Sequence, residues 1–593
     1  MTRSLVRLIL EAHREDPRVP ALPWRVRADH VVLDQSEGTF ALWAFHAGGG
    51  AVAAGLGLLA LLECGLHVAL PGLGRCGHMY AERFAAPGKL ALGCAADLAL
   101  AGALGMLSHA ASRLECAAAL AGAPHAMMPP EVDRVRFHGA PGVGVSGHDI
   151  ALELERRLPA RGADRVIEVC GPGVERLAMR DRFAIAAAAK GLGSRAIVFP
   201  SDEVTHDWMR ALGRDADWKR SPAELEAAAM LELELEAVEP WLQRPGEPEA
   251  IRAVRHAAGT RVRRVIIGPR ATYGDWAALA ACLRGRGVNP RVACVVVPGS
   301  LRTLAAARAG GLWSELEASG IRLAAESGEA GVAPRPEGMV LQYGLDDAAD
   351  EIGHDGAWHA SLESCAAAAL TGAITDPREI VAEGPAQLEP PSYPIDADRI
   401  LAPSAGSGAR APNPRPTVPK RGVVLLRAGD DLSAARVLPL GPKLAALPPE
   451  ELVELVFATI DRGFAARARA AGSGWLVAGR GFLGGPRADL VAWMLARLEV
   501  RVVIARGYAA GAATALVHAG VLPLVASERD DRGLETGDEL EMPGGFEAIE
   551  PGIPVTVRDL TRGTQLLLGH PLGPHEVVVL KAGGILAPAA AAV

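Results

Sequence analysis

The chain has 593 residues, half of them apolar and 22% charged, with a formal net charge of −8 at pH 7. This length is too great for one hydrophobic core, so the sequence predicts several folded units, and the composition excludes a largely disordered chain. Nucleic acids and anionic membranes attract basic faces, so the negative net charge argues against both as partners. We expect small molecules or proteins as partners, and a monomeric chain.

The N-terminal residues do not have the pattern of a secretory signal. In residues 1–16 a short apolar run is interrupted by Glu11, His13 and Arg14, which favours the first helix of a cytoplasmic protein. The longest apolar run, 51–62, is shorter than the roughly 18 residues that a bilayer span requires. No two of the eight cysteines lie within ten residues of each other, so we expect buried, reduced thiols and no C-x-x-C metal or redox site.

Residues 25–383 alternate β-branched runs with Ala- and Leu-rich helical windows. One example is a predicted strand over 164–170, a helix over 180–193 and a strand over 196–200. Such alternation favours α/β units with mostly parallel sheets. Glycine and proline mark the joints at 171–175 and 297–300, where loops after strand ends commonly carry ligands.

Proline, serine and glycine accumulate in residues 384–422 and the periodicity disappears, which predicts a linker. Residues 423–593 then form a separate α/β unit, with strands near 475–479 and 500–505 around a helix over 487–498. The motif GRGFLG at 479–484 fits G-x-G-x-x-G, but no acidic residue follows the second strand. We therefore interpret it as a turn and not as a dinucleotide site.

One short segment concentrates metal-ligating side chains. Asp202, Glu203, His206 and Asp207 lie within six residues, which a metal site could use. A helix start at Asp202 explains the same residues, and we favour that interpretation.

Several ordered segments together resemble the aconitase family, in its shorter bacterial form. They are ERFAAPGK (82–89), 171–214, VVVPGS with its following helix, 367–380, GVLPL (520–524) and GDELEMP (537–543). The resemblance implies an aconitase-like α/β fold. Three packed α/β domains would occupy residues 1–383, a linker 384–422 and a swivel domain 423–593.

The family dehydrates and rehydrates citrate-like tricarboxylates on a 4Fe-4S cluster held by three cysteines. The loop resembling G-S-C-T-N-S reads GPRATY here, so Arg270 stands at the first ligand position. The loop resembling C-G-P-C-I-G reads SGEAGV, so Ser327 and Ala330 stand at the other two. We therefore expect no metal ligands at these positions and no cofactor, with a 4Fe-4S cluster only if this alignment is wrong.

The family's other reactive positions also differ here. The G-S-D-S-H-T loop is matched by GCAADL, which places Asp97 at the histidine position. Gly77 replaces a histidine and His78 follows it, while Pro486 stands where the resemblance implies the catalytic serine base. Ala510 replaces an arginine that grips a substrate carboxylate. A proline cannot act as a base, and an alanine cannot pair with a carboxylate.

Polar residues remain on the loops that would face the family's cleft. No catalytic residue is assigned, but cleft candidates are Asp34, His78, Asp97, Asp489 and Tyr508, with Cys76 and Cys94 beside them. Arg270 and Arg487 are candidates for binding substrate or another anion.

Three hypotheses follow. The first is a clusterless aconitase-family protein without hydro-lyase activity, which binds a small carboxylate ligand or a protein partner, or regulates one. The second is a clusterless enzyme that reuses the cleft for other acid/base chemistry on a carboxylate. The third is an aconitate or homoaconitate hydratase, if the loop alignment is wrong.

Overall fold

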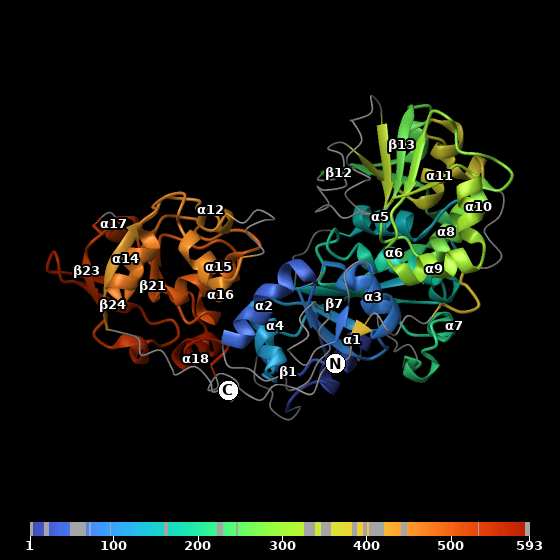
Figure 1. Cartoon of the computed structure of the whole chain (residues 1–593). Coiled ribbons are helices and arrows are strands. Elements are labelled where there is room, and N and C mark those ends of the chain that lie inside the picture. The colour runs from blue at the N-terminus through green and yellow to red at the C-terminus, as the bar shows by residue number, and fades with distance from the viewer. Residues whose placement is uncertain are drawn as a thin grey trace.

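The computed structural model describes residues 4–16, 23–47, 67–69, 73–94, 96–158, 164–221, 229–244, 247–324, 339–344, 357–381, 388–394, 400–401, 420–439, 447–531 and 533–587. This part of the chain is a mixed α/β protein, as predicted, and its C-terminal unit lies beside the remainder (Figure 1). Among the helices so described, none is both long and apolar enough to cross a bilayer.

The first region is a small parallel sheet flanked by helices. Helix α1 confirms the predicted first helix, and the Ser4 side chain caps it by accepting from the Arg7 backbone N–H at 3.1 Å. The strands run in the order β2-β4-β5, and β1 pairs separately with β6. The elements are α1 (Leu5–Ala12), β1 (Trp24–Val26), β2 (His30–Val32), α2 (Gln35–Ala47), α3 (Cys76–Arg83), β4 (Leu90–Gly93), the 3₁₀ helix η1 (Ala96–Leu104), β5 (Leu107–Ala110), α4 (Arg113–Leu120) and β6 (His125–Met127).

The second region is a parallel sheet in the order β10-β7-β8-β9. Its elements are β7 (Glu131–His138), α5 (Gly147–Arg157), β8 (Arg165–Cys170), α6 (Met179–Ala187), β9 (Ala196–Val198), α7 (Glu203–Ala211) and β10 (Leu231–Glu234). The predicted strand–helix–strand unit is confirmed in β8, α6 and β9. Asp202 caps α7 by accepting from the Thr205 backbone N–H at 3.2 Å, which confirms the helix start.

The third region is a larger sheet in the order β12-β11-β17-β16-β13-β14-β15. It is parallel from β17 to β15, while β11 and β12 add an antiparallel edge. Its elements are β11 (Trp241–Arg244), β12 (Glu247–Ala253), β13 (Val262–Ile267), α8 (Tyr273–Leu283), β14 (Ala293–Val296), α9 (Leu301–Ala309), α10 (Leu312–Ala318), β15 (Arg322–Leu323), β16 (Met339–Tyr343), β17 (Trp358–Ala360) and α11 (Leu362–Thr371). The carboxyl ends of its parallel strands share one edge, where ligand-binding loops belong.

The C-terminal unit has its own sheet, in the order β22-β21-β20-β19-β23-β24-β25. The first four of these strands are parallel and the last three are antiparallel. The elements are β19 (Arg421–Arg427), α12 (Ala434–Val437), α13 (Pro449–Leu452), α14 (Phe464–Ala471), β20 (Gly474–Ala478), α15 (Ala488–Arg497), β21 (Val500–Ala505), α16 (Ala512–His518), β22 (Leu522–Val525), α17 (Glu528–Asp531), β23 (Glu539–Glu541), β24 (Val555–Asp559), β25 (Thr564–Leu568) and α18 (Pro574–Ala582). The two predicted strands and the helix between them are confirmed as β20, β21 and α15.

Two contacts join the C-terminal part of the chain to the first region. One apolar core contains Phe40 and Phe45 of α2 and Leu114 of α4, together with Leu490 of α15 and Leu516 of α16. In addition, β18 (Ile400–Leu401) pairs antiparallel with β3 (Val68–Ala69). The C-terminal unit is therefore packed on α2 and α4 through a continuous hydrophobic seam.

Candidate functional site

Loops from the first and third regions meet at the carboxyl ends of β4, β13 and β14. Gly74 and Ser300 form a β-bridge, and the Arg75 backbone N–H donates to the Gly299 carbonyl at 2.9 Å. A Cβ atom on Gly299 would lie 2.0 Å from the Pro269 carbonyl oxygen, so only glycine fits there. The backbone approach of these loops brings the side chains of distant segments into one cluster.

Asp97 is at the centre of this cluster, between two arginines. Arg75 Nε donates to Asp97 Oδ2 at 2.6 Å, and Arg270 Nε donates to Oδ1 at 3.1 Å. The Asp97 side chain is only 4% exposed. Burial alone would raise the pKa of Asp97, but Arg270, Arg75 and His78 outweigh it and hold that pKa below its ordinary value. We define Arg75, His78, Asp97 and Arg270 as the Asp97 cluster.

His78 is the buried neutral member of the Asp97 cluster. Burial, reinforced by Arg75 and Arg270 and opposed by Asp97, lowers the pKa of His78 to about 4. Its Nε2 atom is buried and makes no hydrogen bond within the described residues. At neutral pH the ring is therefore uncharged.

The glycine at position 77 follows from the same packing. A Cβ atom on Gly77 would lie 2.3 Å from the Asp97 Cβ, closer than two such atoms can approach. Helix α3 therefore contacts the 96–104 segment through a residue without a side chain. Any larger residue at position 77 would push Asp97 away from its two arginines.

Two thiols and one more carboxylate border the cluster. Cys76 lies at the start of α3, and its thiol donates to the Leu33 carbonyl at 3.6 Å. Burial, with Asp34, Cys94 and Asp97 nearby, raises the pKa of the Cys76 thiol well above its ordinary value. Asp34 and Cys94 follow the parallel strands β2 and β4, so both lie at the same edge of that sheet. The Cys76 thiol is therefore a poor nucleophile here.

The candidates in the C-terminal unit lie elsewhere. Asp489 accepts from the Arg113 backbone N–H at 2.8 Å and from Arg113 Nη1 at 2.5 Å, which places it in the seam. The Pro486 carbonyl accepts from the same guanidinium at 3.0 Å. The Tyr508 hydroxyl lies 2.8 Å from the Val503 carbonyl and 2.9 Å from the Leu524 carbonyl, and Arg487 occupies the N-cap of α15. Asp489 and Tyr508 are thus engaged in contacts of the fold.

Ser327 and Ala330 lie outside the described residues, so two of the three ligand positions implied by the family resemblance have no geometry here. Within the described ranges, no group of three or more His, Cys, Asp and Glu side chains could hold a metal ion.

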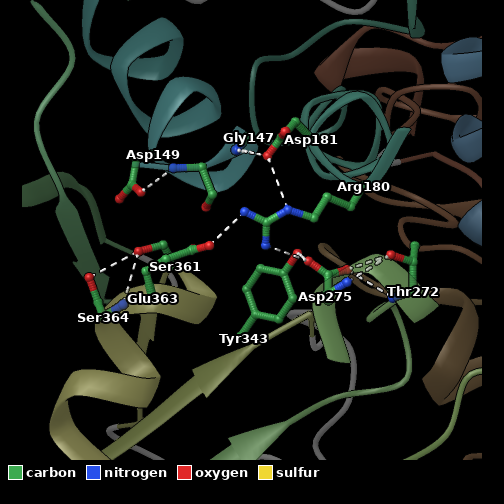
Figure 2. A network of polar contacts seen from close by, with 11 residues as sticks. Gly147, Asp149, Arg180, Asp181, Thr272, Asp275, Tyr343, Ser361, Glu363 and Ser364 are labelled. Carbon is green, nitrogen blue, oxygen red and sulfur yellow. Dashed lines mark hydrogen bonds and ion pairs between the residues drawn. The ribbon is translucent and has the colours of Figure 1, made fainter. Parts of the chain in front are cut away.

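A second buried polar network, which the sequence pattern did not predict, lies close to Arg270 (Figure 2). Arg180 Nη2 donates to Glu363 at 2.6 Å, and its Nη1 lies 3.5 Å from Asp275. The Tyr343 hydroxyl donates to the same Asp275 oxygen at 2.9 Å. Asp275 also caps α8 with Thr272, while Asp149 and Asp181 accept backbone N–H groups at the start of α5. We call this set the Arg180 network.

Burial dominates the titration of the Arg180 network. It raises the pKa of Asp275 to about 6, although Arg180 opposes the shift, and it raises the pKa of Asp149 to about 8. The only sequence signals were the cap motif T-x-x-D at 272–275 and the charged run RDR at 180–182. Neither predicts that Arg180 meets Asp275 and Glu363, which are 95 and 183 residues away.

The Asp97 cluster and the Arg180 network meet at one sheet edge. Arg270 follows β13 and Tyr343 ends the neighbouring strand β16, and the Arg270 backbone N–H donates to the Gly344 carbonyl at 3.1 Å. His148 contacts the Tyr343 ring edge to face, with centroids 5.8 Å apart. Burial, with His359 and Arg270 nearby, lowers the pKa of His148 to about 3.

Comparisons with known proteins agree with the resemblance in the sequence. Residues 60–265 match the model of the aconitase family (aconitate hydratase). The chain is 29% identical to "3-isopropylmalate dehydratase large subunit 2" of Archaeoglobus fulgidus, over 52% of this chain and 78% of that protein. It is 32% identical to the Rubrobacter xylanophilus protein of the same name, over 38% of this chain and 54% of that protein.

One solved structure, a 3-isopropylmalate dehydratase from Methanocaldococcus jannaschii, matches 28% of this chain and 89% of its own, with a TM-score of 0.24 and 22% identity. The family model and the curated relatives assign the protein: the chain belongs to the aconitase family.

Proposed function

We propose that this chain is an aconitase-family protein that has lost the 4Fe-4S cluster and the hydro-lyase activity, and that it serves as a non-catalytic ligand-binding, regulatory or interaction protein. The division into residues 1–383, 384–422 and 423–593 belongs to the same proposal, as does a cytoplasmic location. The observation that carries it is the buried ion pair between Arg270 and Asp97, flanked by Arg75.

The residues present do not fit a cluster. Arg270 stands at a ligand position that the family fills with cysteine, and a guanidinium carries a permanent positive charge and no lone pair for iron. Its Nε is already bound to Asp97, which occupies the family's histidine position. Each reactive group is thus replaced by a residue whose charge the other neutralises, so these two positions support no step of the family's reaction.

The missing terms are large. A metal that polarises the substrate and a positioned base are each worth roughly 10² to 10⁴ in rate. Neutral His78 is too buried to receive a proton from a substrate in water, and the Cys76 thiol is held protonated. These two side chains therefore do not replace the lost groups.

The chemistry that remains suits an anion. Arg75 and Arg270 carry two positive charges against the single charge of Asp97, and their side chains are 30% and 22% exposed. The relatives are named dehydratases of isopropylmalate, a carboxylate. A small carboxylate ligand at these arginines is the binding partner that we propose, and Arg487 is not needed for it.

A second candidate function is acid/base chemistry on a carboxylate without a cluster. The observation that favours it is the His78 Nε2 atom, which is buried next to two arginines and makes no hydrogen bond among the described residues. A carboxylate ligand bound at Arg75 and Arg270 could supply that missing partner. This candidate predicts turnover that is lost in His78→Gln.

Metal analysis tests the proposal. The chain is purified without oxygen and reconstituted with ferrous iron and sulfide, and bound iron, acid-labile sulfide and visible absorbance are measured. We expect no stoichiometric iron or sulfide, and no turnover of citrate, cis-aconitate or isopropylmalate. A cluster bound by the wild-type chain would overturn the proposal.

The matched control is the triple variant Arg270→Cys, Ser327→Cys, Ala330→Cys under the same reconstitution. If the loops keep the family's arrangement, this variant should take up iron and sulfide that the wild type does not. Uptake by the variant alone would attribute the loss of the cluster to these three positions.

A further inference from the structure

The seam between the C-terminal unit and the first region contains a polar cluster as well as an apolar core. Helices α16 and α18 of the C-terminal unit face α2 and α4 of the first region (Figure 1). Ala111 and Ala119, which flank and belong to α4, pack on the same core as Ala519, Ile585 and Leu586. The described surfaces on either side of the seam are therefore largely apolar where they meet, and one polar cluster interrupts them.

Four histidines gather at that place. His109 of β5 and His125 of β6 stack with ring centroids 5.0 Å apart, and His125 Nδ1 lies 3.7 Å from Glu115 of α4. From the C-terminal unit, His518 ends α16 and His575 begins α18, and the Ile585 backbone N–H donates to the His518 carbonyl at 2.9 Å. His125 and His518 are 6% and 9% exposed. We call these four residues the seam histidines.

The seam histidines interact with one another across the boundary. His518 and His125 are the two largest charge interactions of Glu115, so a single carboxylate serves a histidine from each side. His575 interacts with His518 and also with His125. The other charged groups that face the cluster are Arg195 and Asp164 beside His109, and Arg25 and Glu576 beside His575.

The docked arrangement requires neutral rings. Burial lowers the pKa of His125, with Glu115 opposing and His518 reinforcing the shift. Burial and His518 lower the pKa of His575, and burial, His125 and Arg195 lower the pKa of His109 to about 3. One carboxylate cannot balance three or four positive rings within a seam from which water is largely excluded.

We propose that the seam histidines form a pH-dependent latch, which holds the C-terminal unit on α2 and α4 at neutral pH and releases it when the histidines are protonated. The hydrophobic seam supplies the attraction, and like charges from both sides oppose it once the rings are protonated. The Arg113–Asp489 ion pair is the second polar tie across the seam and does not change its charge in this range.

The direction of the effect follows from proton linkage. In the released unit the exposed rings return to an ordinary pKa of about 6.5, above the lowered pKa of the docked state. Docking is therefore complete above about pH 6.5 and weakens as the pH falls below it. Each histidine that must remain neutral costs about tenfold in the docking equilibrium for each pH unit.

Hydrogen exchange on the full-length chain tests the latch. Exchange of peptides covering Arg113–Leu120 and Ala512–His518 is compared at about pH 7.5 and about pH 5.5, after correction for the intrinsic pH dependence of exchange. We expect these peptides to lose protection at the lower pH while core strand β21 keeps it. Small-angle scattering should show a larger radius of gyration under the same conditions. Unchanged protection and radius would overturn the proposal.

Three variants separate the latch from general acid sensitivity. His125→Gln with His575→Gln leaves His518 facing Glu115 as a balanced pair, so this double variant should remain docked at about pH 5.5. Glu115→Gln removes the compensating charge, so release should move to higher pH. The control His206→Gln changes a histidine of α7, away from the seam, and should behave as the wild type.

Thermal unfolding at about pH 7.5 verifies that each variant is folded. Opening of the double variant at the wild-type pH would overturn the role of the histidines. An unshifted release in Glu115→Gln would overturn the role of the carboxylate, and with it the charge balance on which the latch depends.

Discussion

The Asp97 cluster and the Arg180 network are both buried sets of arginines and carboxylates, yet they have opposite charge balance. The Asp97 cluster has two arginines for one carboxylate, whose pKa is lowered. The Arg180 network has one arginine among several carboxylates, and burial raises the pKa values of Asp149 and Asp275. The difference separates a place that can still attract an anion from one that only braces the fold.

Position in the fold explains this difference. In the Arg180 network the carboxylates cap the first turns of α5 and α8, so they serve helix ends that meet between two regions (Figure 2). In the Asp97 cluster the charged groups follow strand ends, at the sheet edge where family members carry out chemistry. The first arrangement has a structural reason for each acid, and the second does not.

Removing the single arginine of the Arg180 network should have the largest effect. In Arg180→Met the buried carboxylates of Glu363 and Asp275 lose their cation, and breaking such a buried pair costs about 3–5 kcal/mol. Chemical denaturation at neutral pH measures this loss in the free energy of unfolding. A loss as small as that of a surface arginine would show that the network is not a brace.

Asp97→Asn should have a smaller effect on stability. It leaves Arg75 and Arg270 facing each other, but both are partly exposed, so we expect a loss of about 1–3 kcal/mol in the same measurement. The variant should also bind small carboxylates more tightly, because two arginines are released. Weaker binding in a calorimetric titration would contradict the anion site.

The pH dependence of stability should distinguish the two sets. The pKa of Asp149 is raised to about 8 in the folded chain, whereas an unfolded aspartate has a pKa of about 3.9. Folding therefore retains a proton, and this contribution to stability is full below about pH 4 and falls as the pH rises toward 8. Between about pH 5 and pH 7 the slope should reach up to about 1.4 kcal/mol per unit.

Asp149→Asn should flatten that slope, because the amide stays neutral at every pH. The comparison is between the slopes of the two proteins, so a loss of absolute stability from a changed hydrogen bond does not affect it. Asp207→Asn, an exposed position on α7, is the control with an unchanged slope. Equal slopes in wild type and Asp149→Asn would contradict a protonated Asp149.

The smallest effect is expected on the surface. Arg210 on α7 pairs with Asp207, and its side chain is 54% exposed. Arg210→Met should change the free energy of unfolding by less than about 0.5 kcal/mol. This variant sets the baseline against which Arg180→Met and Asp97→Asn are compared.

Local pattern was sufficient to predict much of the fold. The first helix, the unit of β8, α6 and β9, and the pair β20 and β21 around α15 all depend on periodicity and caps within a few residues. The ends were less accurate: the helix predicted over 180–193 ends at Ala187. Helix ends depend on which side chains the rest of the protein covers, and a sequence window does not contain that information.

The candidate site was predictable only in part. Asp34, His78, Asp97 and Arg270 follow strand ends or open a helix at one region of the fold, and the family's ordered loops pointed to them. Asp489 and Tyr508 come from loops that the same family places near its cleft, but here they bind Arg113 and backbone carbonyls. Pairing across hundreds of residues depends on how the regions dock.

The sequence by itself determined the α/β class, the family and the residue types at the reactive positions, because these depend on short-range pattern and on residue identity. Only the tertiary structure decided that Arg270 and Arg75 share Asp97, that Gly77 makes room for that carboxylate, and that four histidines meet at the seam. Charge pairs and burial are properties of neighbours in space, which the chain brings together from distant positions.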